Sequence, residues 1–343
     1  MQEGRPTHIN DDGHDTNESV TQKSIDVSSH SGSSRLRVVV ILPFHNEEEN
    51  IKPVSVEILT GLEKFGYEPR LFLVNDGSTD NGLAVVREIS RNDARVNYIS
   101  LSRNFGKETA LMAGIAECGD NFDFLAYMDS DGQHQVSDLL KLLNVCNDEN
   151  TDLVCGVRVS RNYQSPMQRT MARGFYKIFR TLCDTSIAEG SGDFNVMKPV
   201  VVNAMRSITE GHPFVKGIIG WIGFRRTLVP IEIKERVDGT AKSSTLRMFK
   251  LAWSAILSFS SWPLKVWSVI GISFALISIL YLILVILSTI LFGRDVPGYA
   301  TTIVLLLGIG GFQLMSIGIV GEYLARVYDA SKSRPRYLIS ERS

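Results

Sequence analysis

The stretch FLAYMDSDGQ, residues 124–133, joins a short apolar run to two carboxylates. Phe124 to Met128 has the length and composition of a buried strand, and Asp129 and Asp131 follow at its end. Two carboxylates held at a strand end can share a hard divalent cation that also binds a nucleotide diphosphate. Taken alone, such residues more often form a solvated turn. Their setting in the chain therefore has to decide between the two interpretations.

Apolar strand patterns alternate with helical patterns from Arg37 onward. The predicted strands are Val38–Leu42, closed by Pro43, then Leu71–Val74, Val96–Leu101 and Phe124–Met128. The predicted helices are Asn50–Phe65, Asn81–Asn92 and Glu108–Glu117. This alternation predicts an α/β fold with a parallel sheet covered by helices on both faces. Ligands bind such sheets at the carboxyl ends of the strands, which is where the polar motifs of this chain fall.

Two acidic loops, residues 43–47 and 75–80, follow the first two predicted strands. Acidic loops on adjacent strands suit a nucleoside, because carboxylates accept hydrogen bonds from a base N–H and from ribose hydroxyls. The alternative is a pair of ordinary turns with helix-capping residues, for which Asp-Gly-Ser-Thr-Asp at 76–80 is well suited. Either loop alone favours that alternative. Together with Asp129 and Asp131, they favour nucleotide binding.

Two long segments towards the C-terminus, Val266–Gly293 and Val296–Gly321, carry no charged side chain. Each can cross a hydrocarbon core of about 30 Å with some tilt, so they predict a transmembrane hairpin with spans at about 266–292 and 299–321. A pair of buried core helices is the alternative. The turn between the two spans carries one basic residue, Arg294. More basic residues flank the outer ends of the hairpin: Lys265 precedes the first span, and Arg326, Lys332, Arg334 and Arg336 follow the second. This asymmetry predicts that both ends of the chain face the cytoplasm.

The other segments are polar or amphipathic. Residues 1–36 are polar, without the apolar core of a signal peptide, and are predicted to be a disordered tail. Residues 241–263 place apolar side chains at helical spacing among basic ones, which predicts an amphipathic helix in the membrane interface, with a core-facing helix as the alternative. The net charge of −1 argues against a nucleic-acid-binding protein.

Six ordered motifs extend over the chain from about Arg37 to Tyr337. They are Pro43-x-x-Asn46-Glu47, Asp76-Gly77-Ser78-x-Asp80, Leu101-Ser102-Arg103-Asn104-Phe105-Gly106-Lys107-Glu108, Asp129-x-Asp131-x-Gln133, Gly192-Asp193-Phe194 and Arg236-x-x-Gly239-x-x-Lys242. With them the chain resembles the family 2 glycosyltransferases of the GT-A fold, and among these the polyprenyl-phosphate sugar synthases. The resemblance implies a Rossmann-like, mixed and mainly parallel α/β domain at 37–240, the interfacial helix at 241–263, the hairpin at 264–325 and a cytoplasmic tail at 326–343.

The resemblance also implies roles for single residues. A nucleotide-sugar pocket would be lined by Pro43, His45, Glu47, Val74 and Asp76, with Asp129 and Ser130 at the ribose and diphosphate and with Arg158, Arg236 and Lys242 neutralising phosphates. Mg²⁺ or Mn²⁺ would bind Asp129, Asp131 and Gln133, and Asp131 and Asp193 would be the catalytic carboxylates. The chain departs from the family pattern at His45, Ser130, Gln135 and Ser243, which leaves the base and the sugar open.

The implied reaction is an inverting transfer of a hexose from a nucleotide sugar to undecaprenyl phosphate, for modification of cell-surface glycans. Glucose from UDP-glucose is the first expectation, with formamido-arabinose and mannose behind it. The expected location is the bacterial inner membrane, with a multi-pass chain whose catalytic domain and both termini are cytoplasmic. Gly308, Gly310, Gly311 and Gly318 would allow close helix contacts in a homo-oligomer.

The role of Asp193 stays open between proton acceptor and positioning group. A phosphate monoester with a second pKa of about 6 is already largely ionised at neutral pH, so a general base has little to abstract.

Three other functions are possible from the sequence. A processive polysaccharide synthase should carry Gln-x-x-Arg-Trp, and the nearest stretch, residues 164–170, lacks the Trp. A diacylglycerol acceptor is harder to exclude. An idle membrane scaffold is disfavoured because Asp129, Asp131 and Gln133 are all present.

Overall fold

The computed structural model describes residues 35–158, 191–210, 213–232, 262–292, 298–332 and 334–343. The predicted disordered tail at 1–36 and the predicted interfacial helix at 241–263 lie almost entirely outside these residues.

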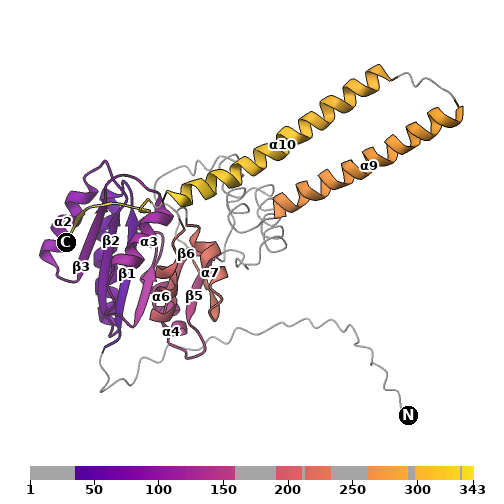
Figure 1. The fold of residues 1–343 in the computed structure, drawn as a ribbon. Coiled ribbons are helices and arrows are strands. Elements are labelled where there is room, and N and C mark those ends of the chain that lie inside the picture. The colour runs from indigo at the N-terminus through magenta and orange to yellow at the C-terminus, as the bar shows by residue number, and fades with distance from the viewer. Residues whose placement is uncertain (1–34, 159–190, 211–212, 233–261, 293–297, 333) are drawn as a thin grey trace, which may run out of the picture. The chain divides into compact units, whose positions relative to one another are not determined.

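Strands and helices alternate in the first part of the described chain, as predicted (Figure 1). The strands there are β1 (Arg37–Phe44), β2 (Glu68–Asn75), β3 (Val96–Leu101), β4 (Phe124–Tyr127), β5 (Leu153–Arg158), β6 (Ser191–Met197) and β7 (Arg226–Ile231). The helices are α1 (Glu48–Lys64), α2 (Gly82–Asn92), α3 (Lys107–Glu117), α4 (Val136–Cys146), α6 (Pro199–Ser207) and α7 (Val215–Trp221).

The first strand is longer than predicted, because β1 continues through Pro43 to Phe44. A proline removes one backbone N–H from a ladder. Here the pairing of β1 with β4 ends at Ile41, so Pro43 lies beyond it, and the strand continues along β2 alone.

The sheet is mixed and mainly parallel, in agreement with the expected fold class. Its strand order is β7-β5-β6-β4-β1-β2-β3-β8. The pairs β1–β2, β1–β4, β2–β3 and β5–β7 are parallel, whereas β6 runs antiparallel to both β4 and β5. The carboxyl ends of β1, β2 and β4 therefore meet at one edge of the sheet, and the start of β6 reaches the same edge.

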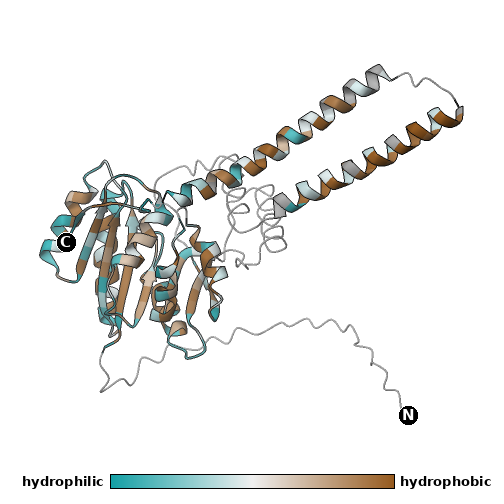
Figure 2. Ribbon diagram, viewed as in Figure 1, coloured by the Kyte–Doolittle hydropathy of each residue, from teal (hydrophilic) through white to brown (hydrophobic). Residues whose placement is uncertain are grey.

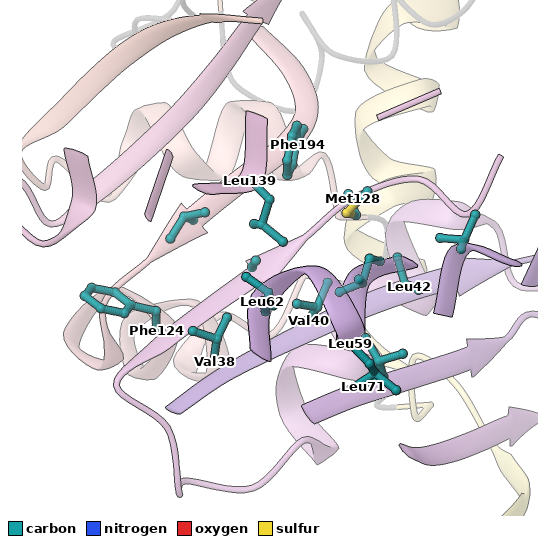
Figure 3. Packing of buried hydrophobic residues seen from close by; sticks show 14 of the residues in the cluster. Val38, Val40, Leu42, Leu59, Leu62, Leu71, Phe124, Met128, Leu139 and Phe194 are labelled. Carbon is teal, nitrogen blue, oxygen red and sulfur yellow. The ribbon is translucent and has the colours of Figure 1, made fainter. Parts of the chain in front are cut away.

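The two faces of the sheet carry separate hydrophobic clusters. Side chains alternate along β1, so that Val38, Val40 and Leu42 belong to one cluster, while Val39 and Ile41 belong to the other. Helices α1 and α4 cover the first face, part of which is drawn in Figure 3, and helices α3 and α6 cover the second. Each fully buried Leu, Ile or Val contributes about 1.5–3 kcal/mol.

Helix α3 packs very closely on the sheet through Gly114. A Cβ atom at this position would lie 2.6 Å from Cγ2 of Ile41 and 2.9 Å from Cγ2 of Val74. A glycine is therefore required where the helix crosses β1 and β2. This close packing helps to set the depth at which the N-terminus of α3 lies against the site.

Two long helices, α9 (Trp262–Phe292) and α10 (Tyr299–Ser331), follow the α/β domain in the chain. The ring of Phe312 in α10 lies 6.1 Å from the ring of Trp267 and 5.1 Å from that of Phe274, both in α9. Among the described residues, one helix segment, Lys265–Leu291, is long and apolar enough to cross a membrane, and none of it is buried in the protein. In Figure 2 the ribbon of α9 carries mostly the colour of hydrophobic residues.

The segment predicted as a cytoplasmic tail, 326–343, contains regular structure. Helix α10 continues to Ser331, and Ile339–Arg342 forms an eighth strand, β8, which pairs antiparallel with β3 at the sheet edge. Glu341 accepts hydrogen bonds from the Arg87 guanidinium and, at 2.6 Å, from the Tyr98 hydroxyl. These contacts hold the pKa of Glu341 at about 2, with the Arg87 hydrogen bond as the main cause.

Candidate active site

A cavity of about 340 Å³ lies at the carboxyl ends of β1, β2 and β4. This volume is within the range of small-molecule sites. The residues that line it come from the ends of the three strands, from the loop after β3 and from the start of α3: Pro43, Phe44, His45, Glu47, Asp76, Asn104, Gly106, Lys107, Ala110, Asp129, Ser130 and Asp131. The cavity thus brings together most of the residues that the sequence predicted for nucleotide-sugar binding.

The two acidic loops are held together by their own turn residues. Asn46 adopts a φ of 57°, a left-handed conformation that asparagine tolerates better than most residues. Its Oδ1 accepts the Thr79 N–H at 2.8 Å, and its own N–H donates to Oγ of Ser78 at 3.1 Å. The Asn75 Oδ1 accepts the Ser78 N–H at 3.0 Å. The loops therefore form turns, and the turn hydrogen bonds also hold in place residues that line the cavity.

Asp76 organises the loop that precedes α3. It is 3% exposed, and its two carboxylate oxygens accept the backbone N–H groups of Phe105 at 2.7 Å and Gly106 at 2.9 Å. The carbonyl oxygen of Asp76 lies 2.9 Å from Nδ1 of His45. A carbonyl can only accept, so this contact places the proton of His45 on Nδ1. Asp76 thus lines the cavity and also fixes the backbone that leads to Lys107.

Val74 is the predicted pocket residue that the structure places elsewhere. Its side chain is fully buried under α3, next to Gly114, and belongs to the hydrophobic cluster on that face of the sheet. The alternation of side chains along β2 explains the difference, because the last residues of a strand point to opposite faces.

A network of ion pairs begins at Lys107 and Asp129, which both line the cavity. The Lys107 Nζ lies 2.5 Å from Oδ1 of Asp129 and 2.5 Å from Oδ2 of Asp193, so one ammonium group bridges the end of β4 and the start of β6. The Lys216 Nζ of α7 lies 3.1 Å from Oδ1 of Asp193. Burial acts to lower the pKa of Lys107, but the two carboxylates outweigh it and raise that pKa.

The pKa values of Asp129 and Asp193 are shifted in opposite directions. Burial acts to raise the pKa of Asp193, but Lys216 and Lys107 outweigh it and bring that pKa to about 2. Burial raises the pKa of Asp129, and the nearby charge of Asp193 adds to the effect, whereas Lys107 opposes it. Asp193 is therefore a carboxylate at any neutral pH, held between two ammonium groups.

Glu108, Asn195 and His134 are three further polar residues next to this network of ion pairs. The Glu108 Oε2 accepts the Val215 N–H at 3.0 Å, which ties α3 to the first residue of α7. Burial raises the pKa of Glu108, and the charge of Asp193 adds to it. On β6, the Asn195 Nδ2 donates to the buried Tyr127 hydroxyl at 2.7 Å. The ring of buried His134 packs at a tilt against the ring of Phe194, the neighbour of Asp193, with 4.7 Å between the ring centroids.

The predicted metal ligands suit a cation that is shared with a substrate. Asp129 and Asp131 both line the cavity and offer hard carboxylate oxygens. The Asp131 Oδ1 accepts the Gln133 N–H at 3.2 Å, and the Ser130 hydroxyl donates to the Pro43 carbonyl at 3.2 Å, so the acidic turn is held in place. Within the described ranges, no three His, Cys, Asp or Glu side chains cluster closely enough to hold a metal alone. Mg²⁺ is usually bound by one or two carboxylates plus substrate phosphates, and the donor set here fits that pattern.

Comparison with known proteins gives the family. A model described as glycosyl transferase family 2 matches residues 39–204, and a model described as the GtrB C-terminal hairpin matches residues 262–327. The bactoprenol glucosyl transferase of Shigella phage SfX is 36% identical over 308 residues, which cover 90% of this chain and 100% of that protein. The putative glycosyltransferase CsbB of Bacillus subtilis is 36% identical over 89% of this chain and 91% of its own. The chain belongs to glycosyl transferase family 2.

Among solved structures, one match is the glucosyl-3-phosphoglycerate synthase of Mycobacterium tuberculosis, in complex with Mn²⁺, UDP and glucosyl-3-phosphoglycerate. It has a TM-score of 0.47 and 15% identity, and the match covers 65% of this chain and 79% of that chain.

Some predicted site residues of this glycosyltransferase stay untested by the structure. Arg236 and Lys242 lie outside the described residues, as does the side chain of Arg158. Three residues at the centre of the site, Lys107, Glu108 and Lys216, were not among the predicted site residues. Lys107 and Glu108 belong to the motif at 101–108, and the position of Gly106 before a predicted helix was a usable signal. No local pattern distinguishes Lys216.

Proposed function

We propose that this glycosyltransferase moves a hexose, most simply glucose from UDP-glucose, to a polyprenyl phosphate such as undecaprenyl phosphate. The observation that carries the proposal is the presence, in one chain, of an acidic strand-end cavity and of an apolar helix able to cross a membrane. Such a pairing suits a water-soluble donor and a lipid acceptor. The relative in Shigella phage SfX, which is named a bactoprenol glucosyl transferase, matches over both parts.

The donor would bind with its nucleoside between the first two loops and its diphosphate towards β4. His45 and Glu47 line the cavity from the loop after β1, and Asp129 and Asp131 line it from the turn after β4. A divalent cation, Mg²⁺ or Mn²⁺, would be held by Asp129 and Asp131, with Gln133 nearby, and would supply Lewis-acid stabilisation of the departing diphosphate. Arg158, Arg236 and Lys242 remain candidates for additional phosphate contacts.

The acceptor needs little help from a base. Its phosphate is largely ionised at neutral pH, since the second pKa of a phosphate monoester is about 6. A carboxylate with a pKa of about 2, such as Asp193, is a much weaker base than that phosphate. We therefore assign Asp193 a positioning and electrostatic role: its negative charge orients Lys107 and Lys216 and stabilises positive charge that develops on the sugar ring. Attack opposite the diphosphate would invert the anomeric centre.

The helices would bring the site to the bilayer. In this proposal α9 and α10 span the bacterial inner membrane as a hairpin, with the catalytic domain and both termini in the cytoplasm. The basic residues that follow the second span support this orientation. The small residues of α10, among them Gly310 and Gly311, would support contacts between copies of the chain.

The direct test is a screen of UDP- and GDP-sugars with undecaprenyl phosphate and with diacylglycerol, scored by the mass of the lipid product. We expect a hexosyl-phosphoryl lipid from UDP-glucose and none with EDTA. Asp131→Asn should abolish transfer, because an amide is a poor ligand for a hard cation, whereas Asp80→Asn, outside the cavity, should remain active. Glucosyl diacylglycerol as the main product, or normal turnover by Asp131→Asn, would contradict the proposal.

A further inference from the structure

Lys107 occupies a position that a divalent cation would share. It is the first residue of α3, and it follows Gly106, whose φ of 95° turns the chain into the helix. The Gly106 N–H is fixed by the Asp76 carboxylate at 2.9 Å. The ammonium group of Lys107 therefore reaches Asp129 and Asp193 from a backbone that is held in place, although its side chain is 45% exposed.

The contact with Asp129 creates a competition between two cations. Oδ1 of Asp129 lies 2.5 Å from the Lys107 Nζ, the distance of a direct charge-assisted hydrogen bond. A hard cation that binds Asp129 uses the same carboxylate oxygens. Such a cation must either replace the ammonium or bind beside it and meet its repulsion. In both cases the metal binds weakly when no nucleotide is bound and the protein supplies all the ligands.

A diphosphate changes this balance, because it adds negative charge and further oxygen ligands. The released ammonium also keeps a partner, since Lys107 contacts Asp193 at 2.5 Å as well. The cost of separating Lys107 from Asp129 is then offset only when the anion of the donor arrives together with the metal.

We propose that Lys107 is a resident counter-ion that prevents tight binding of a divalent cation to Asp129 until a nucleoside diphosphate is present. The inference rests on the proposed function in that it takes the donor to be a nucleotide sugar. It adds that metal and nucleotide bind as a coupled pair, and that Lys107 supplies part of the coupling. Because coupling is reciprocal, the metal should raise nucleotide affinity by the same factor by which the nucleotide raises metal affinity.

Lys216 offers a matched control. Like Lys107, it is a lysine that forms an ion pair with Asp193, at 3.1 Å, whereas Lys107 also contacts Asp129, at 2.5 Å. Removal of either charge disturbs Asp193. Only the removal of Lys107 should free Asp129 for the metal.

The experiment titrates Mn²⁺ into the detergent-solubilised full chain, with free Mn²⁺ followed by electron paramagnetic resonance, with and without UDP. For the wild type we expect weak binding alone and much tighter binding with UDP. Lys107→Met should bind Mn²⁺ without UDP at least tenfold more tightly than the wild type, equivalent to about 1.4 kcal/mol. The tightening caused by UDP should shrink by the same factor. Lys216→Met should stay within about threefold of the wild type in Mn²⁺ affinity.

Lys107→Gln provides a second variant, because its side chain is only one atom shorter and keeps a hydrogen-bond donor but no charge, and it should behave like Lys107→Met. Unchanged Mn²⁺ affinity in the folded Lys107 variants, while UDP still tightens binding in the wild type, would overturn the inference and leave the proposed function standing. Equal tightening by Lys216→Met would also overturn it, since the effect would then arise through Asp193. A wild type that binds no Mn²⁺ even with UDP would overturn both proposals.

Discussion

Asp76→Asn should loosen the loop before α3 while keeping the size of the side chain. The two carboxylate oxygens of Asp76 accept the N–H groups of Phe105 at 2.7 Å and of Gly106 at 2.9 Å. Asparagine offers one acceptor oxygen, and its NH₂ group would face a backbone donor in place of the second. At 3% exposure, water has little access to compensate.

The size of the effect follows from these two bonds. A hydrogen bond to a charged group contributes about 1.5–3 kcal/mol, and the variant loses one such bond and makes the other neutral. We expect the free energy of local opening to fall by about 2–3 kcal/mol. Because each 1.4 kcal/mol is a factor of ten, protection of the two amides should fall roughly 30- to 150-fold.

Hydrogen–deuterium exchange of peptides that cover residues 102–110 measures this protection in the full chain. Asp80→Asn is the control, because Asp80 also accepts two backbone N–H groups, from Glu48 and Gly82, both at 3.0 Å, and does not line the cavity. It should increase exchange at its own partners and leave Phe105 and Gly106 unchanged. Wild-type protection at those two amides in Asp76→Asn would refute the reasoning.

Three further predictions concern pH, backbone strain and topology. The pKa of Asp193 is about 2, against an ordinary value of 3.8, so its titration should not change the transfer rate between about pH 5 and 8. Its contribution to the free energy of unfolding should be complete above about pH 4 and lost as the pH falls towards 2. A pH dependence of the rate between pH 5 and 8 that disappears in Asp193→Asn would contradict this prediction. Gly77→Ala should lower the unfolding free energy by about 2 kcal/mol or more in denaturant titrations, because φ is 63° and the new Cβ would lie 2.3 Å from the carbonyl carbon of Arg103; an unchanged midpoint would show that the loop adapts. Gly298→Cys should react with an impermeant maleimide in intact cells, and reaction only after permeabilisation would reverse the predicted orientation.

The inner strands could be predicted because their side chains carry the signal locally. Leu71–Val74 and Val96–Leu101 are apolar runs bounded by turn residues, and the structure contains both as strands. Strand β8 could not be predicted, since Ile339–Arg342 is short and three of its four residues are polar. Its place depends on partners such as Tyr98, which is 243 positions away from Glu341 in the chain.

The same distinction applies to the site. Asp129 and Asp131 could be found because they follow an apolar strand directly. The bridging role of Lys107 could not, because its contact with Asp193 joins residues 86 positions apart. That contact also depends on β6 running antiparallel beside β4, which no periodic pattern in the sequence indicates.

The return of the chain to the sheet as β8 makes the two long helices an insertion into the catalytic domain rather than an appendage to it. A shortened protein that stops before α9 would lack β8 and leave β3 as an open edge, with unpaired backbone groups that invite aggregation. A soluble form of the enzyme should therefore be made by excision of the two helices, with a flexible linker that joins the chain after Lys242 to residues near Arg334, so that the phosphate-contact candidates and both chain segments of the domain are kept.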